Sequence, residues 1–142
     1  MPNMGDPIDG NLAASNAVSG AGYILTNDST NNRVKLHPGG DVVPLGISAG
    51  DSERDADGTL LTTADASVSF YPVVGMQMVR IKGEQTFTTG LPVYCGAGGL
   101  ALDSADASGQ QIGLYLGSGI DSVNIADGVI QIPVMCSGVG HA

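Results

Sequence analysis

The sequence predicts an all-β protein, a small sandwich or barrel of short strands. Three observations favour this fold class. Glycine contributes 22 of the 142 residues, and it disfavours helix interiors by about 1 kcal/mol per position relative to alanine. No window shows the sustained apolar i, i+3, i+4, i+7 pattern of an amphipathic helix. From Gly22 onward, short β-like runs alternate with turn residues, which is typical of sandwiches and small barrels.

The expected strands are short aliphatic and β-branched runs bounded by Gly, Asn, Asp or Pro. In chain order they span residues 23–26, 33–36, 42–47, 67–74, 77–82, 86–88, 92–94, 100–102, 112–116, 123–125 and 129–135. Turns are expected at Asn31-Asn32, Pro38-Gly39-Gly40 and Asp127-Gly128, among others. Because the strands are short, a meander or barrel is favoured over long sheets.

A weak two-fold internal repeat relates residues 22–48 to residues 90–116. Each half has a strand, a tight turn, a second strand, a polar loop and a third strand, and Leu45-Gly46-Ile47 matches Ile112-Gly113-Leu114. After a further loop, residues 65–73 resemble residues 127–134. We therefore expect two β units of similar plan to pack together. Chance similarity between glycine-rich strands is the alternative interpretation.

The chain divides into an N-terminal arm and one domain. Residues 1–21 are rich in Gly, Asn, Ser and Ala and show neither the helical nor the strand period. They are predicted to form a flexible, extended arm, although Ile8, Leu12 and Val18 would give it apolar surface to bury on a partner. Residues 22–142 are predicted to form a single β domain, as the length of the chain allows.

The charge balance excludes several classes of partner. The formal net charge is -9 with only five Lys plus Arg, so the side chains that neutralise phosphates are scarce and direct nucleic-acid binding is not expected. Attraction to anionic membranes is not expected either, and the longest apolar runs are far below the ~20 residues of a spanning helix. The N-terminus has neither a basic region nor an apolar region typical of a signal peptide, so synthesis in the cytoplasm is expected.

An acidic loop at residues 51–57 is the strongest candidate for a metal site. Asp51, Glu53, Asp55 and Asp57 alternate as in calcium loops. A loop starting at Glu53 has glycine at its sixth position, but its twelfth residue is Ala64, where a bidentate glutamate is required. We interpret the loop as a solvated turn without a required metal, so a chelator should leave stability unchanged.

The remaining candidates do not form a catalytic site. Nucleophilic catalysis requires a histidine base and an orienting partner, yet His37 precedes turn residues and His141 is penultimate. Both are interpreted as surface or turn histidines. Cys95 and Cys136 are interpreted as small apolar core residues; a disulfide between them is the alternative, since sequence does not place their Cα atoms within ~6 Å. No catalytic, cofactor-binding or metal site, and no enzymatic activity, is expected.

The order of the strands from Gly22 to Cys136 resembles that of the capsid decoration (cement) proteins of tailed bacteriophages. The stretches that carry the resemblance are residues 22–26, 43–47, 68–74, 77–81, 90–94, 111–116 and 129–134. The resemblance implies a structural virion protein on the exterior of an icosahedral head. It would form homotrimers and stabilise contacts between major capsid protein subunits. The longer acidic loop at residues 50–65 departs from the pattern.

Two other functions stay open. One is a small β-barrel accessory domain that binds a ligand or a carbohydrate, and the other is a structural protein of a phage tail or baseplate.

The strand edges predict contacts between subunits. A chain of short strands with few Lys, Arg or edge Pro residues has few features that prevent strand edges from pairing with other chains. We therefore expect other subunits to cover some strand edges, with residues 67–74 or 129–135 as candidates for the shared surface.

Overall fold

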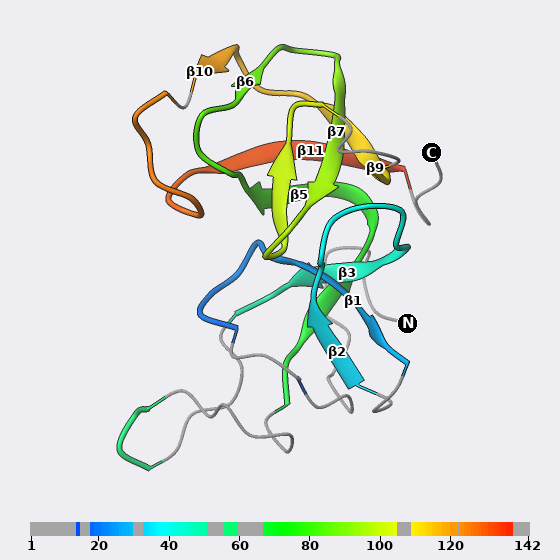
Figure 1. Ribbon diagram of the computed structural model, residues 1–142, viewed down its shortest axis with the longest axis vertical. Helices are drawn as coiled ribbons and strands as arrows, with labels where there is room; N and C mark the ends of the chain where they lie inside the picture. Colours follow the sequence, from blue (N-terminus) through cyan, green and yellow to red (C-terminus); the bar gives the residue numbers. More distant parts are fainter. Residues whose placement is uncertain are drawn as a thin grey trace.

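The computed structural model describes residues 14, 18–29, 33–50, 56–59, 67–104, 109–121 and 123–137. Every regular element in these ranges is a β-strand. The strands form antiparallel sheets in a sandwich-like arrangement without closing into a barrel (Figure 1). The predicted all-β fold is therefore confirmed, in its sandwich form.

The first sheet lies in the lower half of Figure 1 and has the strand order β2-β1-β3-β4. Its strands are β1 (Ile24–Asp28), β2 (Arg33–Leu36), β3 (Pro44–Ser48) and β4 (Phe70–Pro72). All three pairings in this sheet are antiparallel.

The second sheet lies in the upper half of Figure 1 and has the order β5-β11-β9-β7-β8. Its strands are β5 (Val74–Arg80), β7 (Pro92–Gly96), β8 (Leu100–Leu102), β9 (Gln111–Tyr115) and β11 (Gln131–Ser137). A separate two-stranded sheet pairs β6 (Thr86–Phe87) with β10 (Ile120–Asp121).

The internal repeat is present in the topology. The order β2-β1-β3-β4 corresponds strand for strand to β8-β7-β9-β11, with all pairings antiparallel in both. Both copies also shift register at the same place, between Leu25 and Thr26 in β1 and between Val93 and Tyr94 in β7. Only β5 has no counterpart among the described strands of the first sheet.

The two glycines matched by the repeat occupy equivalent close contacts. Gly46 pairs with Pro72 and Gly113 pairs with Cys136. A Cβ atom on Gly46 would lie 2.5 Å from the carbonyl oxygen of Tyr71, and one on Gly113 would collide with the carbonyl oxygen of Met135. In both halves the neighbouring backbone fills the space of a side chain, so the two positions require glycine.

The first sheet is buried on both of its faces. Ile24 and Ile47, which pair with each other, belong to the main core together with residues of the second sheet such as Val79. Leu25 and Val34 belong to a second, smaller cluster. This explains why β1 begins with consecutive buried residues instead of the alternation of a strand with one solvated face.

The predicted N-terminal arm, residues 1–21, lies mostly outside the described residues. Of its described part, Ala14 and Val18 are each 1% exposed and pack in the smaller cluster. Arg80 of β5 donates from Nε to the carbonyl oxygen of Ala21 at 2.6 Å. This part of the segment therefore packs on the β domain, and the role of an arm on a partner stays a prediction.

Most predicted strands are found within a few residues of their expected bounds, and two expectations are wrong. The run at 123–125 is not a strand: Asn124 has a positive φ of 64°, and the strand in this region is β10. The run at 67–74 is interrupted at Val73, because the chain there leaves β4 in the first sheet and enters β5 in the second.

Replacement of Gly113 by alanine should destabilise the protein by about 1–3 kcal/mol, because β11 must move away from the added methyl group. Gly50→Ala is the matched control, since a Cβ atom there would meet no atom within 4 Å. Urea denaturation of both variants measures the difference. Equal stability of the two variants would show that the β9–β11 contact is not tight.

Candidate interaction surface

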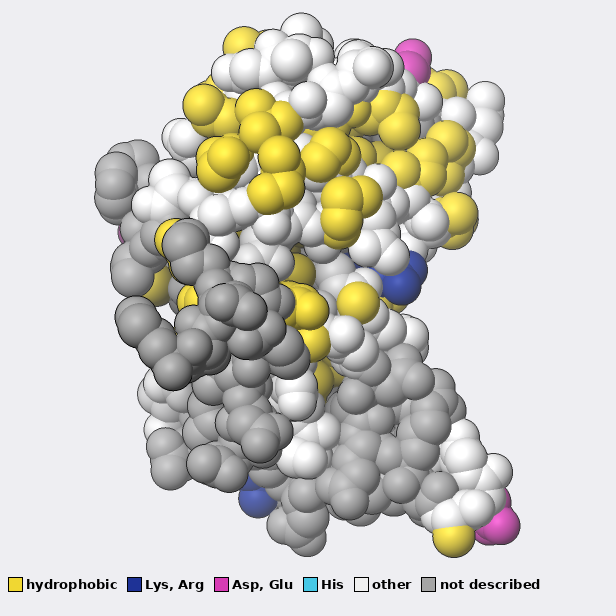
Figure 2. Space-filling view, turned by 180° about the vertical axis from the view of Figure 1, so that it is seen from behind, with side chains coloured by type: hydrophobic (Ala, Val, Ile, Leu, Met, Phe, Trp, Pro, Cys, Tyr) yellow, Lys and Arg dark blue, Asp and Glu magenta, His cyan; other side chains and the backbone are white. Residues whose placement is uncertain are grey.

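The outer face of the second sheet carries a continuous apolar surface. The apolar face, as we call it, consists of five residues that are each 40–53% exposed. They are Met76 and Met78 of β5, Leu114 of β9, Leu116 directly after β9, and Met135 of β11. Figure 2 shows hydrophobic side chains gathered over the half of the molecule that contains this sheet.

Strand register places the members of the apolar face side by side. Met76 pairs with Met135, and Met135 pairs in turn with Leu114 on the next strand. Pairs directly opposite in a sheet have Cβ atoms about 4.5–5.5 Å apart. The three side chains therefore form a row across β5, β11 and β9. A second row follows, because Met78 pairs with Pro133 and the Leu116 N–H donates to the Pro133 carbonyl at 3.1 Å.

The usual alternation is reversed in the middle of β5, where the polar Gln77 faces inward between two methionines that face outward. Gln77 is buried, and its Nε2 donates to the carbonyl oxygens of Pro72 at 3.2 Å and Val74 at 3.1 Å. These bonds satisfy the backbone where the chain passes from one sheet to the other. The period of two then directs Met76 and Met78 outward.

Such a face is suited to binding another protein. Contiguous exposed apolar surface on a folded chain typically marks an interaction site. Methionine is unbranched and polarizable and adapts to irregular partners, which is why it is frequent on binding surfaces. None of the five side chains carries a charge, so a partner can cover them without desolvating an ion.

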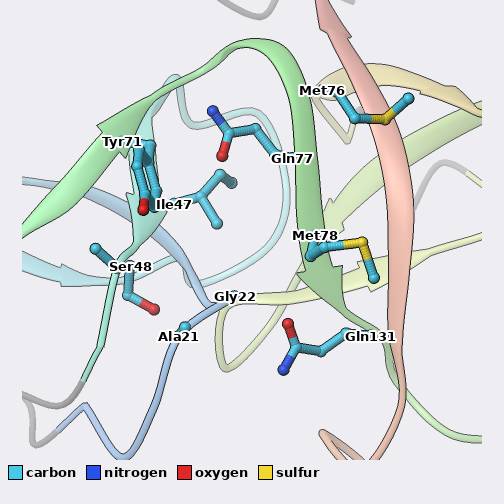
Figure 3. Close-up of a pocket in the computed structure, with 10 residues that line it drawn as sticks. Ala21, Gly22, Ile47, Ser48, Tyr71, Met76, Gln77, Met78 and Gln131 are labelled. Carbon is cyan, nitrogen blue, oxygen red and sulfur yellow. The ribbon is translucent and has the colours of Figure 1, made fainter. Parts of the chain in front are cut away.

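A groove of about 330 Å³ adjoins the apolar face, on the side of β5 that is away from β11 (Figure 3). Its walls include Gly22, Ile47, Ser48, Tyr71, Gln77 and Gln131. The side chain of Gln77 points toward Tyr71 and Ile47, whereas those of Met76 and Met78 point the other way. None of the lining residues is charged.

His37 is a buried structural histidine, so the expectation of a surface residue is corrected while its place beside a turn is as predicted. Its ring is 0% exposed. Nδ1 accepts the N–H of Gly39 at 2.9 Å, so the proton resides on Nε2, which donates to the Val42 carbonyl at 2.7 Å. Burial lowers the pKa of His37 below 6.5. The hydrogen bond to the Val42 carbonyl opposes this shift, and the positive charge of Lys35 adds to it. The ring supports the loop between β2 and β3.

Cys95 and Cys136 are free, buried thiols in the main core, as interpreted from the sequence. The alternative of a disulfide is not observed. Burial raises the pKa of each thiol to about 12, and the other sulfur adds to the effect at Cys95. Both therefore act as small apolar side chains.

The other candidate residues lie largely outside the described ranges. This applies to Asp51, Glu53 and Asp55 of the acidic loop and to His141, while Asp57 is exposed in a turn. The described ranges contain no group of three or more His, Cys, Asp or Glu side chains able to hold a metal ion. They also contain no helix that could span a membrane. The absence of a required metal stays a prediction.

A scan against protein-family models gave no match, and neither did a search of curated proteins. The role of the chain is therefore inferred from the surface itself. Met135 lies in one of the two stretches proposed from the sequence for a shared surface, residues 129–135. The other four members of the apolar face were missed, because apolar residues in strands are expected to face the core. The signal available was the polar Gln77 between two methionines.

The burial of neutral His37 makes stability depend on pH. Its pKa is lower in the folded than in the unfolded chain, so the unfolded state takes up the proton first on acidification. The contribution of neutral His37 to the free energy of unfolding is complete above a pH of about 6.5. Below that pH it declines, with a slope of at most about 1.4 kcal/mol per pH unit. In urea titrations between pH 7.5 and 5.5, His37→Gln should lose less stability than the wild type. Parallel pH profiles would contradict the assigned role.

Both thiols should resist labelling in the native protein. With a pKa of about 12, on the order of one thiol in ten thousand is ionised at pH 8, and the thiolate is the reactive form. Titration with a chromogenic disulfide reagent should detect almost no thiol in the native protein and both thiols in urea. Rapid labelling of either thiol in the native protein would show that the main core is open to solvent.

Proposed function

We propose that the chain is a structural protein that binds other proteins through its apolar face, and that its partner is the outer surface of an icosahedral viral head. There it stabilises contacts between major capsid protein subunits. The observation that carries the proposal is the uncharged cross-strand surface formed by Met76, Met78, Leu114, Leu116 and Met135. The viral partner comes from the resemblance of the strand order to capsid decoration proteins.

The shape of the apolar face supports a role in assembly. A standard protein interface buries about 800 Å² on each partner, with an apolar centre and a polar rim. Rows of large side chains on three adjacent strands provide such a centre. A protein that binds the assembled lattice but not separate subunits stabilises the lattice by mass action. Many copies acting together reinforce a shell even when each one binds weakly.

The charge of the chain is consistent with this role. A net charge of -9 keeps unbound copies soluble and apart before assembly. The apolar face itself is uncharged, so repulsion between copies falls on other parts of the surface. We propose homotrimers at local three-fold axes of the head as the arrangement, following the same resemblance. A density map of the particle tests it, and isolated copies away from every local three-fold axis would reject it.

A ligand-binding role is the second candidate, and the groove beside β5 favours it. Its volume of about 330 Å³ falls at the lower end of the range of small-molecule sites, about 300–1,000 Å³. Tyr71, Gln77 and Gln131 in its walls are residue types that bind sugars and amides. A saturable rise in melting temperature with a small ligand would support this role, whereas co-purification with a particle of several megadaltons supports the first.

Introducing a charge into the apolar face should weaken attachment to the heads. Met135→Glu and Leu114→Glu are each expected to weaken binding at least tenfold, because an unpaired carboxylate would be buried in the interface. Val123→Glu is the matched control, since Val123 is 51% exposed in the loop after β10, outside the apolar face. Co-sedimentation with heads of the virus that encodes the chain measures the effect.

Urea denaturation should show that the three variants fold as stably as the wild type. If both face variants bind as well as the control, the apolar face is not the attachment surface. If even the wild type does not sediment with the heads, the viral partner is wrong.

A further inference from the structure

We infer that the free edge of β5, at Met76 and Met78, binds an extended peptide segment of a partner protein as an added β-strand. The inference deepens the proposed function by naming what part of a partner the chain recognises. It rests on the direction of the backbone groups of β5 and on the groove that lies against them.

The backbone groups of Met76 and Met78 point away from β11. The Arg80 N–H donates to the Gly22 carbonyl at 2.8 Å, on the side opposite to β11. Because alternate residues of a strand direct their N–H and C=O groups to the same side, those of Met78 and Met76 face the same way. Among the described residues, no backbone group pairs with the N–H of either methionine on this side.

The groove lies along this edge. Met76, Gln77 and Met78 all line it, although consecutive side chains of a strand point to opposite faces. Three consecutive residues of one strand border the same space only when that space lies beside the strand (Figure 3). An unpaired edge of this kind is complementary to a peptide backbone, whose donors and acceptors recur with the same period.

The groove has room for a single added strand. Its far wall is formed by Ile47, Ser48 and Tyr71 of the first sheet, so a second sheet cannot approach β5 edge to edge. At one end the site is closed by Gly22, which already occupies the edge opposite Arg80. A segment of roughly three to five residues therefore fits, given a rise of about 3.4 Å per residue in an extended strand.

The lining of the groove defines the composition of this segment. Since none of the lining residues is charged, a charged side chain entering the groove would lose hydration without gaining a partner. Alternate residues of the segment would contact Tyr71 and Gln77 on one side and the methionines on the other. We therefore expect an uncharged, β-forming sequence that alternates small polar and β-branched residues.

The first experiment measures amide hydrogen exchange in the isolated protein by NMR. The amides of Met76 and Met78 should exchange quickly because they face the groove. Those of Gln77 and Val79 should be slow because they face β11. If the Met76 and Met78 amides are already as protected as that of Val79, the edge is covered within the chain and the inference is overturned.

The second experiment adds a capped pentapeptide of alternating threonine and valine as the probe. At ten times its dissociation constant, exchange of the Met76 and Met78 amides should slow about tenfold, since only the unbound fraction exchanges. The same peptide N-methylated at every residue should have no effect. Equal protection by both peptides, or unchanged exchange over a panel of such pentapeptides at millimolar concentration, would overturn the inference.

Variants at position 76 separate the backbone from the side chain. Met76→Pro removes the N–H on the free edge but none of the bonds to β11, and Met76→Leu keeps the N–H. Peptide binding should be lost in the first variant and retained in the second, with the Val79 amide protected in both as a check of folding. Loss in both variants would mean that the side chain, and not strand addition, holds the peptide.

These measurements require no viral particle, so they distinguish failure of strand addition from failure of the proposed capsid partner. Peptide binding without attachment to heads would uphold the edge site and reject the capsid. Attachment to heads that is lost in Met135→Glu, together with no peptide protection of the Met76 and Met78 amides, would uphold the apolar face and reject the edge site.

Discussion

The close contact between a glycine and a carbonyl of the neighbouring strand, made by Gly46 in the first sheet and by Gly113 in the second, sets the register on which the rest of the structure depends. Gly113 lies opposite Cys136, with the Met135 carbonyl in the space of a side chain. Because strand side chains alternate, a slip of one residue would turn Met135 inward and Cys136 outward. The main core and the apolar face therefore exist only in this one register, and Gly46 makes the equivalent contact in the first sheet.

The two sheets have different tasks although they share one plan. The first is enclosed between the main core, which Ile24 joins, and the smaller cluster, to which Leu25 belongs. The second packs only its inner face on the core and presents the apolar face outward. The strand without a counterpart, β5, supplies both methionines beside the groove. The groove and two of the five members of the apolar face, Met76 and Met78, thus lie where the repeat is broken.

The repeat, the short strands and the aliphatic core were predictable from sequence because each depends on local pattern. Strands 33–36 and 100–102 were predicted with their observed bounds. The break at Val73 was not, since it reflects a change of sheet, and the strand expected at 123–125 failed because Asn124 adopts a left-handed conformation. The apolar face was largely missed for a physical reason. Gln77 faces inward and donates to the carbonyls of Pro72 and Val74. Its neighbours Met76 and Met78 therefore face outward, although apolar residues of a strand are expected to face the core.

The pairing of β5 with β11 has a mechanical consequence. Val74, which follows directly from the first sheet, pairs with Ser137, and the pairing continues from there to Arg80 and Gln131. Tension applied between the first sheet and the end of β11 would therefore act on the hydrogen bonds between β5 and β11 one pair after another. It would not load all of them together, as a shearing force along the strands would. Because the pairs open in turn, such a pull should separate β5 from β11 at a lower force than a pull in shear. A load-bearing attachment is better carried across the breadth of the sheet than along the chain.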